Sequence, residues 1–162
     1  MKNLFYFFAL LIPAACSQQA MPAQGTAAEN EASAMAYDSI LAAQLGADEY
    51  GMKSYVMAFL KAGPTRSQDK EEAARLQRAH LDNITRMAEA GQLVLAGPFL
   101  DEGEVRGIYI FNVPTVEEAR ALTESDPAIQ AGRLVMELHP WYGSAALMEL
   151  NALHKKVAKK GI

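Results

Sequence analysis

Two residues of this sequence, His80 and Asp126, are of the types that could together move a proton near neutral pH. The segment ARLQRAHLDNITRM, residues 74–87, has apolar residues three and four positions apart, which predicts a helix with one core-facing stripe. His80 falls near the centre of that stripe, where leucine or isoleucine is usual. The imidazole is therefore either a neutral core histidine with one fixed partner, or a group that faces a cleft and exchanges protons.

Asp126 is the carboxylate best suited to hold one nitrogen of that imidazole. It stands in ESDPAIQAG directly before Pro127, which is the pattern of a helix N-cap followed by proline at the first helical position. One carboxylate oxygen can cap the helix while the other accepts a hydrogen bond from an imidazole. The structural role and the functional role of Asp126 are therefore compatible, and the sequence leaves both open.

Three further residues are candidates for lining the same pocket. His139 stands at the predicted end of a strand, and Asp101 and Arg106 flank a predicted hairpin loop. Their alternative is an ordinary place on the strand or loop surface. His154 falls in a predicted C-terminal helix, where we expect it to be solvated.

No cofactor or metal is predicted. His80, His139 and Asp126 could nominally bind a metal ion, but the sequence lacks the His-x-His or His-x-x-x-His spacing of such sites. It also lacks a glycine-rich phosphate loop and a dinucleotide fingerprint. No Ser or Cys nucleophile motif accompanies the candidates, so acyl transfer is not favoured.

The composition favours one globular domain with appendages. The chain has 162 residues, of which 51% are hydrophobic, and its net charge is −4 without any basic stripe. Nucleic acid is therefore excluded as a predicted partner. The only local excess of positive charge lies at the C-terminus, and we interpret it as a helix end that complements the dipole rather than as a membrane patch; it consists of Lys155, Lys156, Lys159 and Lys160.

The N-terminus has the pattern of an export signal. Residues 1–15 contain one lysine, an apolar run too short to cross a bilayer, and small residues before Cys16, the only cysteine. This predicts a lipoprotein signal peptide with Cys16 lipidated, although Pro13 stands where leucine is usual. The alternative is a soluble secreted protein with one unpaired thiol. The residue after Cys16 is Ser17 and not Asp, which by resemblance to Gram-negative lipoproteins favours the outer membrane if the source is Gram-negative. We therefore expect a periplasm-facing protein that touches membrane only through its lipid.

The remaining chain alternates strand and helix patterns in the order β-α-β-β-α-β. This is the ferredoxin-like arrangement of the α+β class. The first half is predicted to contain a strand that ends at Gly63-Pro64, a helix over 68–90 that ends at Gly91, and strands over 92–97 and 106–113. A second helix begins at a Thr115/Glu118 capping box and is followed by a helical turn after Asp126. The last element is a strand over 133–143 that is stopped by Pro140.

Five segments result from this assignment. A flexible tether over 16–37 follows the signal peptide, and 38–52 form a short helical lead-in, with Asp38 as a possible N-cap and a helix end at Gly46. The main domain spans 53–144. The remaining residues, 145–162, form an amphipathic C-terminal helix whose apolar stripe consists of Leu147, Leu150, Leu153 and Val157.

A four-stranded sheet with both helices on one side leaves its other face uncovered. We predict a homodimer in which a second copy of the sheet covers that face. The alternating residues expected there are Tyr55, Met57, Phe59, Ile108, Ile110 and Asn112.

Three motifs in the right order resemble the YciI-like (YCII-related) family: AHLDNITRMAEAGQLVLAGPF, RGIYIFNV and SDPAIQAGRLVMELHPWYG. The resemblance covers about residues 53–144. HPWYGSAAL and GADEYGMKSYVMAFLKAGP also resemble an exported, lipoprotein-like branch of that family. Gln77 stands where many members carry an arginine three residues before the histidine, so the anion-holding role of that arginine does not carry over.

The resemblance implies a dimeric α+β barrel with a His-Asp site at His80 and Asp126. One relative is a dehydrochlorinase of chlorinated hydroxyquinols. The resemblance thus implies cofactor-independent proton transfer, lyase- or dehydrochlorinase-like, on a small polar or aromatic molecule, with His80 as base or acid and Asp126 fixing its tautomer. The alternative is a non-catalytic module of the cell envelope that binds a small ligand or serves in assembly.

Overall fold

A computed structural model describes residues 36–161 of the chain. The elements below all belong to one compact unit, which begins at Asp38. The predicted signal peptide, Cys16 and the predicted tether up to residue 35 lie outside the described residues. Among the helices of residues 36–161, none is both long enough and apolar enough to cross a bilayer.

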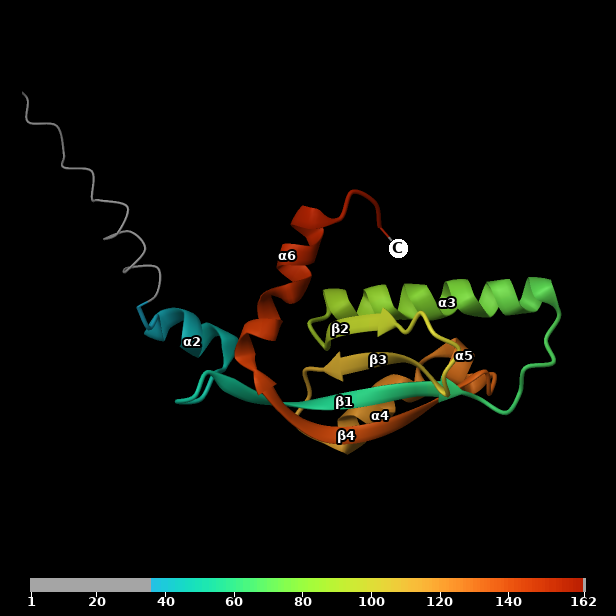
Figure 1. The fold of residues 1–162 in the computed structure, drawn as a ribbon, viewed down its shortest axis with the longest axis horizontal. Coiled ribbons are helices and arrows are strands. Elements are labelled where there is room, and N and C mark those ends of the chain that lie inside the picture. Colours follow the sequence, from blue (N-terminus) through green and yellow to red (C-terminus); the bar gives the residue numbers. More distant parts are fainter. Residues whose placement is uncertain (1–35, 162) are drawn as a thin grey trace, which may run out of the picture. The chain divides into compact units, whose positions relative to one another are not determined.

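Four antiparallel strands form one sheet in the order β2-β3-β1-β4 (Figure 1). The predicted alternation of strands and helices is confirmed, and with it the α+β class and a sheet consistent with the ferredoxin-like arrangement. The strands are β1 (Met52–Ala62), β2 (Leu93–Pro98), β3 (Val105–Phe111) and β4 (Leu134–Ser144). The helices are α2 (Ser39–Leu45), α3 (Lys70–Glu89), α4 (Val116–Glu124), α5 (Pro127–Gln130), a 3-10 turn η1 (Ala145–Glu149) and α6 (Leu150–Val157).

The long helix α3 buries one stripe against the sheet. Its N-cap is Asp69, whose side chain accepts from the backbone N–H of Glu72 at 2.8 Å. It ends before Gly91, which adopts a left-handed φ of 69° as predicted. The buried residues recur at helical spacing, so α3 presents one face to the core; they are Leu76, His80, Asn83 and Met87.

The shorter helices also begin at the caps that the sequence predicts. The Thr115 hydroxyl accepts from the Glu118 N–H, and the Asp38 carboxylate accepts from two N–H groups of α2. Gly46 ends α2 at a φ of 69°. These caps satisfy donors that the first turn of a helix leaves free, which is why the helix starts could be located from sequence.

The core lies between the sheet and the helices α3 and α4. Side chains from β1, β2 and β3 meet both helices there, and burial of these apolar groups is the main stabilising contribution. The buried members are Val56, Ala58, Leu60, Met87, Leu93, Tyr109, Phe111, Val113 and Ala119.

The predicted stop at Pro140 is wrong. Strand β4 runs through this proline to Ser144, and Pro140 pairs with Val56 of β1. A proline removes a donor from the ladder, but β4 is an edge strand, where alternate N–H groups face away from the sheet. The strand therefore continues past Pro140 without losing a pairing hydrogen bond.

The C-terminal helix is also not the single element predicted. It begins with the 3-10 turn η1 and becomes α-helical only over Leu150–Val157. Leu147 and Met148 of η1 pack against a second cluster formed by Tyr55, Val94 and Ile110. The C-terminal segment thus covers one end of the sheet face that we expected to be open.

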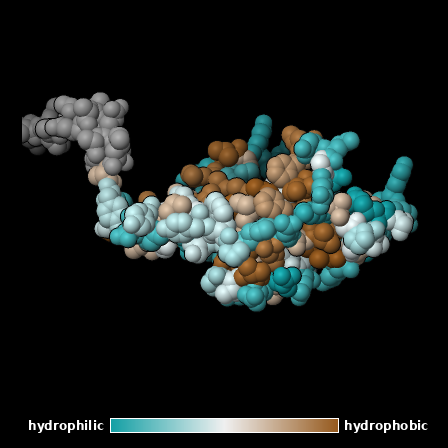
Figure 2. Space-filling view, turned by 60° about the horizontal axis from the view of Figure 1, so that its bottom comes forward, coloured by the Kyte–Doolittle hydropathy of each residue, from teal (hydrophilic) through white to brown (hydrophobic). Residues whose placement is uncertain are grey.

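Residues 36–161 leave the rest of that face uncovered. Met57, Phe59 and Ile108 are half-buried side chains on this side of the sheet. Asn112 does not belong to it, because it lies beyond the end of β3 and donates from Nδ2 to the carbonyl of Gly91 at 3.1 Å. Figure 2 shows that apolar residues gather in a band on the surface of the unit, bordered by hydrophilic side chains.

Candidate functional site

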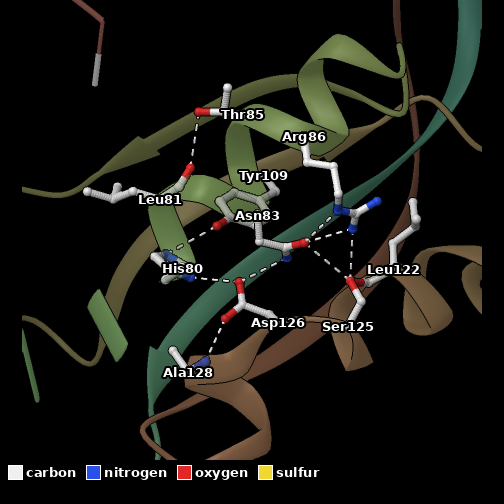
Figure 3. Close-up of polar contacts among 10 residues, drawn as sticks. All are labelled: His80, Leu81, Asn83, Thr85, Arg86, Tyr109, Leu122, Ser125, Asp126 and Ala128. Carbon is white, nitrogen blue, oxygen red and sulfur yellow. Dashed lines mark hydrogen bonds and ion pairs between the residues drawn. The ribbon is translucent and has the colours of Figure 1, made fainter. Parts of the chain in front are cut away.

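Three elements bring polar side chains together beneath helix α3 (Figure 3). Helix α3 supplies His80 and Asn83, which share its buried face because they stand three residues apart. The N-cap of α5 supplies Asp126, and strand β3 supplies Tyr109 from the face of the sheet that packs against α3. All four residues are buried, so their polar groups must satisfy one another.

Asp126 makes both of the contacts that the sequence left open, the helix cap and the contact to the imidazole. Its Oδ1 accepts from the N–H of Ala128 at 2.8 Å, which caps α5. Its Oδ2 lies 2.7 Å from Nδ1 of His80. Asp126 has no solvent exposure and His80 only 7%, so this is a buried carboxylate–imidazole pair.

Tyr109 completes a chain of three groups. Its hydroxyl oxygen lies 3.2 Å from Nε2 of His80, on the opposite side of the ring from Asp126. Because an ionised carboxylate only accepts, Nδ1 of His80 carries the proton and donates it to Asp126. In the neutral ring Nε2 is then an acceptor, and the Tyr109 hydroxyl donates to it.

The protonation states of the two outer groups follow from their surroundings. Burial raises the pKa of Asp126, but the hydrogen bond that it accepts from His80, together with those from Ala128 N–H and Asn83, outweighs burial and holds the pKa below its ordinary value. Burial, assisted by the negative charge of Asp126, raises the pKa of Tyr109 well above its ordinary value. Asp126 is therefore ionised and Tyr109 is protonated at neutral pH.

A second set of contacts fixes the carboxylate from the other side. Nδ2 of Asn83 donates to Oδ2 of Asp126 at 3.3 Å. The amide is held in this orientation because its Oδ1 accepts from the Arg86 guanidinium at 2.7 Å. Arg86 also donates to the hydroxyl of Ser125 at 3.1 Å, beside Asp126 in the chain. The network thus ties α3 to the start of α5 and orients the aspartate.

The site is enclosed in the described chain. Of the two interpretations of His80, the one that places it at a cleft is not seen within the described residues, because Tyr109, itself only 2% exposed, closes the free nitrogen of the ring. Two grooves in the surface lie against α6, and His80 lines neither of them. A molecule that exchanges a proton with His80 must therefore do so through the Tyr109 hydroxyl or displace it.

The other predicted pocket residues are not brought to this pair. His139 of β4 pairs with Met57, so it lies on the sheet face opposite α3, where its Nε2 is 2.8 Å from Glu137 Oε1. Asp101 is exposed between β2 and β3, and Arg106 is exposed on β3. Within one chain, none of the three lines a common site with His80.

Sequence reasoning missed Tyr109 and Asn83. Tyr109 is the one residue with a hydroxyl in the apolar run IYIF, and Asn83 follows His80 at the i+3 position of the same helix face. Both signals were readable as polar groups at core positions. The sequence does not show that the fold places Tyr109 of β3 against His80 of α3.

The described residues offer no metal centre. No group of three or more His, Cys, Asp or Glu side chains within residues 36–161 is arranged so that it could hold a metal ion.

Fold and site together define a small α+β protein with a buried carboxylate–imidazole–phenol chain. The family model of the YCII-related domain matches residues 55–142, which is more than half of the chain. The chain belongs to the YCII-related domain family.

One solved structure with a likeness to this chain is 5-chloro-2-hydroxyhydroquinone dehydrochlorinase (TftG) from Burkholderia phenoliruptrix AC1100, in complex with 2,5-dihydroxybenzoquinone. The match has a TM-score of 0.41 and 17% sequence identity, and it covers 53% of this chain and 92% of that chain. A comparison with curated protein sequences gives no match.

Proposed function

We propose that this chain is a cofactor-independent enzyme that transfers a proton to or from a small polar or aromatic molecule. The observation that carries the proposal is the buried hydrogen-bonded triad Asp126–His80–Tyr109. Oδ2 of Asp126 lies 2.7 Å from Nδ1 of His80, and the Tyr109 hydroxyl lies 3.2 Å from Nε2. A carboxylate that fixes the tautomer of an imidazole leaves one nitrogen as the site of proton exchange.

The reactive atom in this proposal is Nε2 of His80. As His80 accepts a proton there, the ring becomes an imidazolium that the Asp126 carboxylate stabilises. The Tyr109 hydroxyl can pass its own proton to Nε2 while it takes one from the substrate, so that the phenol acts as a relay. In a lyase-type reaction, the electron pair of the broken C–H or O–H bond forms a new double bond, and the leaving group departs with its bonding electrons.

Burial supports this chemistry in two ways. The raised pKa of Tyr109 keeps the phenol a donor, and the lowered pKa of Asp126 keeps the carboxylate charged. The direction of both hydrogen bonds to His80 is therefore fixed before a substrate binds. The low local dielectric also strengthens the attraction between Asp126 and an imidazolium.

Wash-in of solvent deuterium tests the proposal whatever the leaving group is. A panel of small phenols, hydroxyquinones and ketones, including 5-chloro-2-hydroxyhydroquinone, is incubated with the protein in D2O and followed by proton NMR. We expect exchange at one acidic position with the wild type, loss of exchange in His80→Gln, and retention in the control His139→Gln. Equal exchange in the wild type and His80→Gln contradicts the proposal.

The alternative is a non-catalytic module that binds a small ligand or serves in assembly. The 7% exposure of His80 favours it, because a buried pair can simply fasten α3 to α5. His80→Gln then lowers the free energy of unfolding and changes no exchange rate. Measuring both quantities on the same variant separates the two functions.

We also propose that the chain forms a homodimer through the uncovered part of the sheet. Met57, Phe59 and Ile108 form an apolar area there that a second copy of the same face would bury. Light scattering at micromolar concentration should give twice the chain mass. Phe59→Glu should give the monomer mass, whereas Leu100→Glu, at an exposed loop leucine, should leave the dimer intact.

We further propose that the chain is exported and anchored by a lipid on Cys16. The support is the signal-like pattern of residues 1–15 and the single cysteine after it. The protein should incorporate labelled palmitate and sediment with membranes. Cys16→Ser should lose both properties, and unchanged labelling of this variant would contradict the proposal.

A further inference from the structure

Helix α6 leaves an open groove between itself and the body of the domain. It follows η1 at the end of the sheet, and Figure 1 shows it extending away from the strands. Its attachment to the sheet includes the amide of Asn151, which donates to the carbonyl of Leu93 at 2.8 Å. Between α6 on one side and the C-terminal half of α3 with β2 on the other lies a groove of about 680 Å³.

Both walls of this groove are predominantly apolar. On α6, Leu150, Leu153 and Val157 stand at i, i+3 and i+7, so they share one helix face, and all three line the groove. Ile84 of α3 and Leu95 of β2 line the opposite wall. Leu153 is 53% exposed and Val157 80% exposed, so the described part of the chain leaves much of the apolar face of α6 uncovered.

The rim of the groove is predominantly basic. Lys155, Lys159 and Lys160 line it, against one acidic residue, Glu89 of α3. Within residues 36–161 no carboxylate forms an ion pair with any of these lysines. An apolar interior with ammonium groups at its edge is complementary to a molecule with an apolar body and an anionic end.

We propose that this groove binds a fatty-acid-like anion, that is, an unbranched aliphatic chain with a terminal carboxylate. The aliphatic chain lies between the α6 face and the Ile84–Leu95 wall, and the carboxylate meets the lysines of the rim. The volume lies within the range of about 300–1,000 Å³ that is usual for small-molecule sites. Two facing apolar walls fit an inserted chain, which is contacted on both sides, better than a flat lipid surface, which would contact α6 on one side.

This site is separate from the proton-transfer site. The groove includes Ile84, one helical turn beyond His80, but no member of the Asp126–His80–Tyr109 chain. The proposal therefore does not rest on the proposed enzymatic function. Loss of activity in a His80 variant and loss of fatty-acid binding in a groove variant are independent results.

Fluorescence titration of the full chain tests the site, with cis-parinaric acid as the probe below its micellar concentration. We expect saturable binding that laurate displaces. Displacement by 1-dodecanol should be about fivefold weaker, because it lacks the charge that the lysines recognise. No saturable binding of the probe, or equal displacement by the alcohol and the acid, overturns the proposal.

Variants with matched controls locate the binding. Leu153→Asp/Val157→Asp should weaken binding about tenfold or more, because it places charge on the apolar wall. Lys155→Gln should weaken it about threefold. Leu100→Asp and Lys70→Gln alter an exposed leucine and an exposed lysine that do not line the groove, and should bind as the wild type does. Binding that is unaffected by the groove variants, with circular dichroism unchanged, overturns the assignment.

A vesicle sedimentation experiment distinguishes an aliphatic chain bound in the groove from binding of α6 to a membrane surface. The non-lipidated variant Cys16→Ser is sedimented with phosphatidylcholine vesicles and with phosphatidylglycerol vesicles. Absence of co-sedimentation together with laurate binding supports the groove site. Co-sedimentation with phosphatidylglycerol that Leu153→Asp/Val157→Asp abolishes, without any laurate binding, replaces it by a lipid-surface interaction of α6.

Discussion

The carboxylate of Asp126 is shared between two neighbours, with Oδ2 placed 2.7 Å from Nδ1 of His80 and Oδ1 placed 2.8 Å from the N–H of Ala128. One side chain thereby starts helix α5 and orients an imidazole carried by α3. Asp126 is held in place as the N-cap before Pro127, so its position does not depend on a bound substrate. The N-cap of α5 therefore determines where the carboxylate of the candidate site lies.

Substituting Asp126 separates these two roles. Asparagine caps helices as well as aspartate does, so Asp126→Asn keeps the cap and removes the charge that faces His80. We expect a loss of about 2 kcal/mol in the free energy of unfolding, since the carboxylate–imidazole hydrogen bond is buried. Urea unfolding measures the loss. Asp69→Asn, at the exposed N-cap of α3, should change stability by less than about 0.5 kcal/mol, and an equal effect of both variants would mean that only capping matters.

The same substitution should change how stability depends on pH. The pKa of Asp126 is lower in the folded state than in the unfolded chain, where an aspartate titrates near about 3.9. A lowered folded-state pKa means that the contribution is fully present above the unfolded value and is lost as the pH falls through the folded one. The stability difference between the wild type and Asp126→Asn should be constant near neutrality and shrink below about pH 4. A difference that does not change down to about pH 2.5 would contradict the lowered pKa.

Two glycines of the β2–β3 pair allow a matched test of backbone packing. A Cβ on Gly107 would lie 2.6 Å from the carbonyl oxygen of Gly97, whereas a Cβ on Gly97 would meet nothing within 4 Å. Gly107→Ala must push the strands apart, at a cost of about 1–3 kcal/mol. Gly97→Ala should leave stability nearly unchanged. Thermal unfolding of the two variants side by side checks the difference, and equal melting temperatures would contradict the close strand approach.

Features of the fold that depend on residues close together in the sequence could be predicted, and features that depend on distant residues could not. The caps at Asp38, Thr115 and Asp126 act within one helical turn, so they could be read directly from the order of residues. Pro140 was misread because its tolerance depends on β4 being an edge strand, which is a property of the whole sheet.

The residues that cover the open face of the sheet, and the full set of residues in the site, also come from segments far apart in the sequence. Tyr55 and Ile110 are buried by Leu147 and Met148 of the C-terminal segment, which follows the domain in the sequence. Periodicity placed these residues on one face but could not say what packs on it. In the same way, no spacing rule joins Tyr109 to His80, because they lie on different elements that meet only through the fold.

Tyr109 offers the most direct test of the buried chain. Its pKa is raised by burial and by the nearby charge of Asp126, so it should stay protonated at alkaline pH for as long as the fold persists. The chain has six tyrosines. We expect spectrophotometric titration to about pH 11 to give the same phenolate absorbance for the wild type and Tyr109→Phe, because the removed group does not ionise in that range. Circular dichroism at each pH establishes that both proteins are folded. A wild-type absorbance larger by the contribution of one tyrosine would show that Tyr109 ionises freely and that its hydroxyl is not held as the donor to His80.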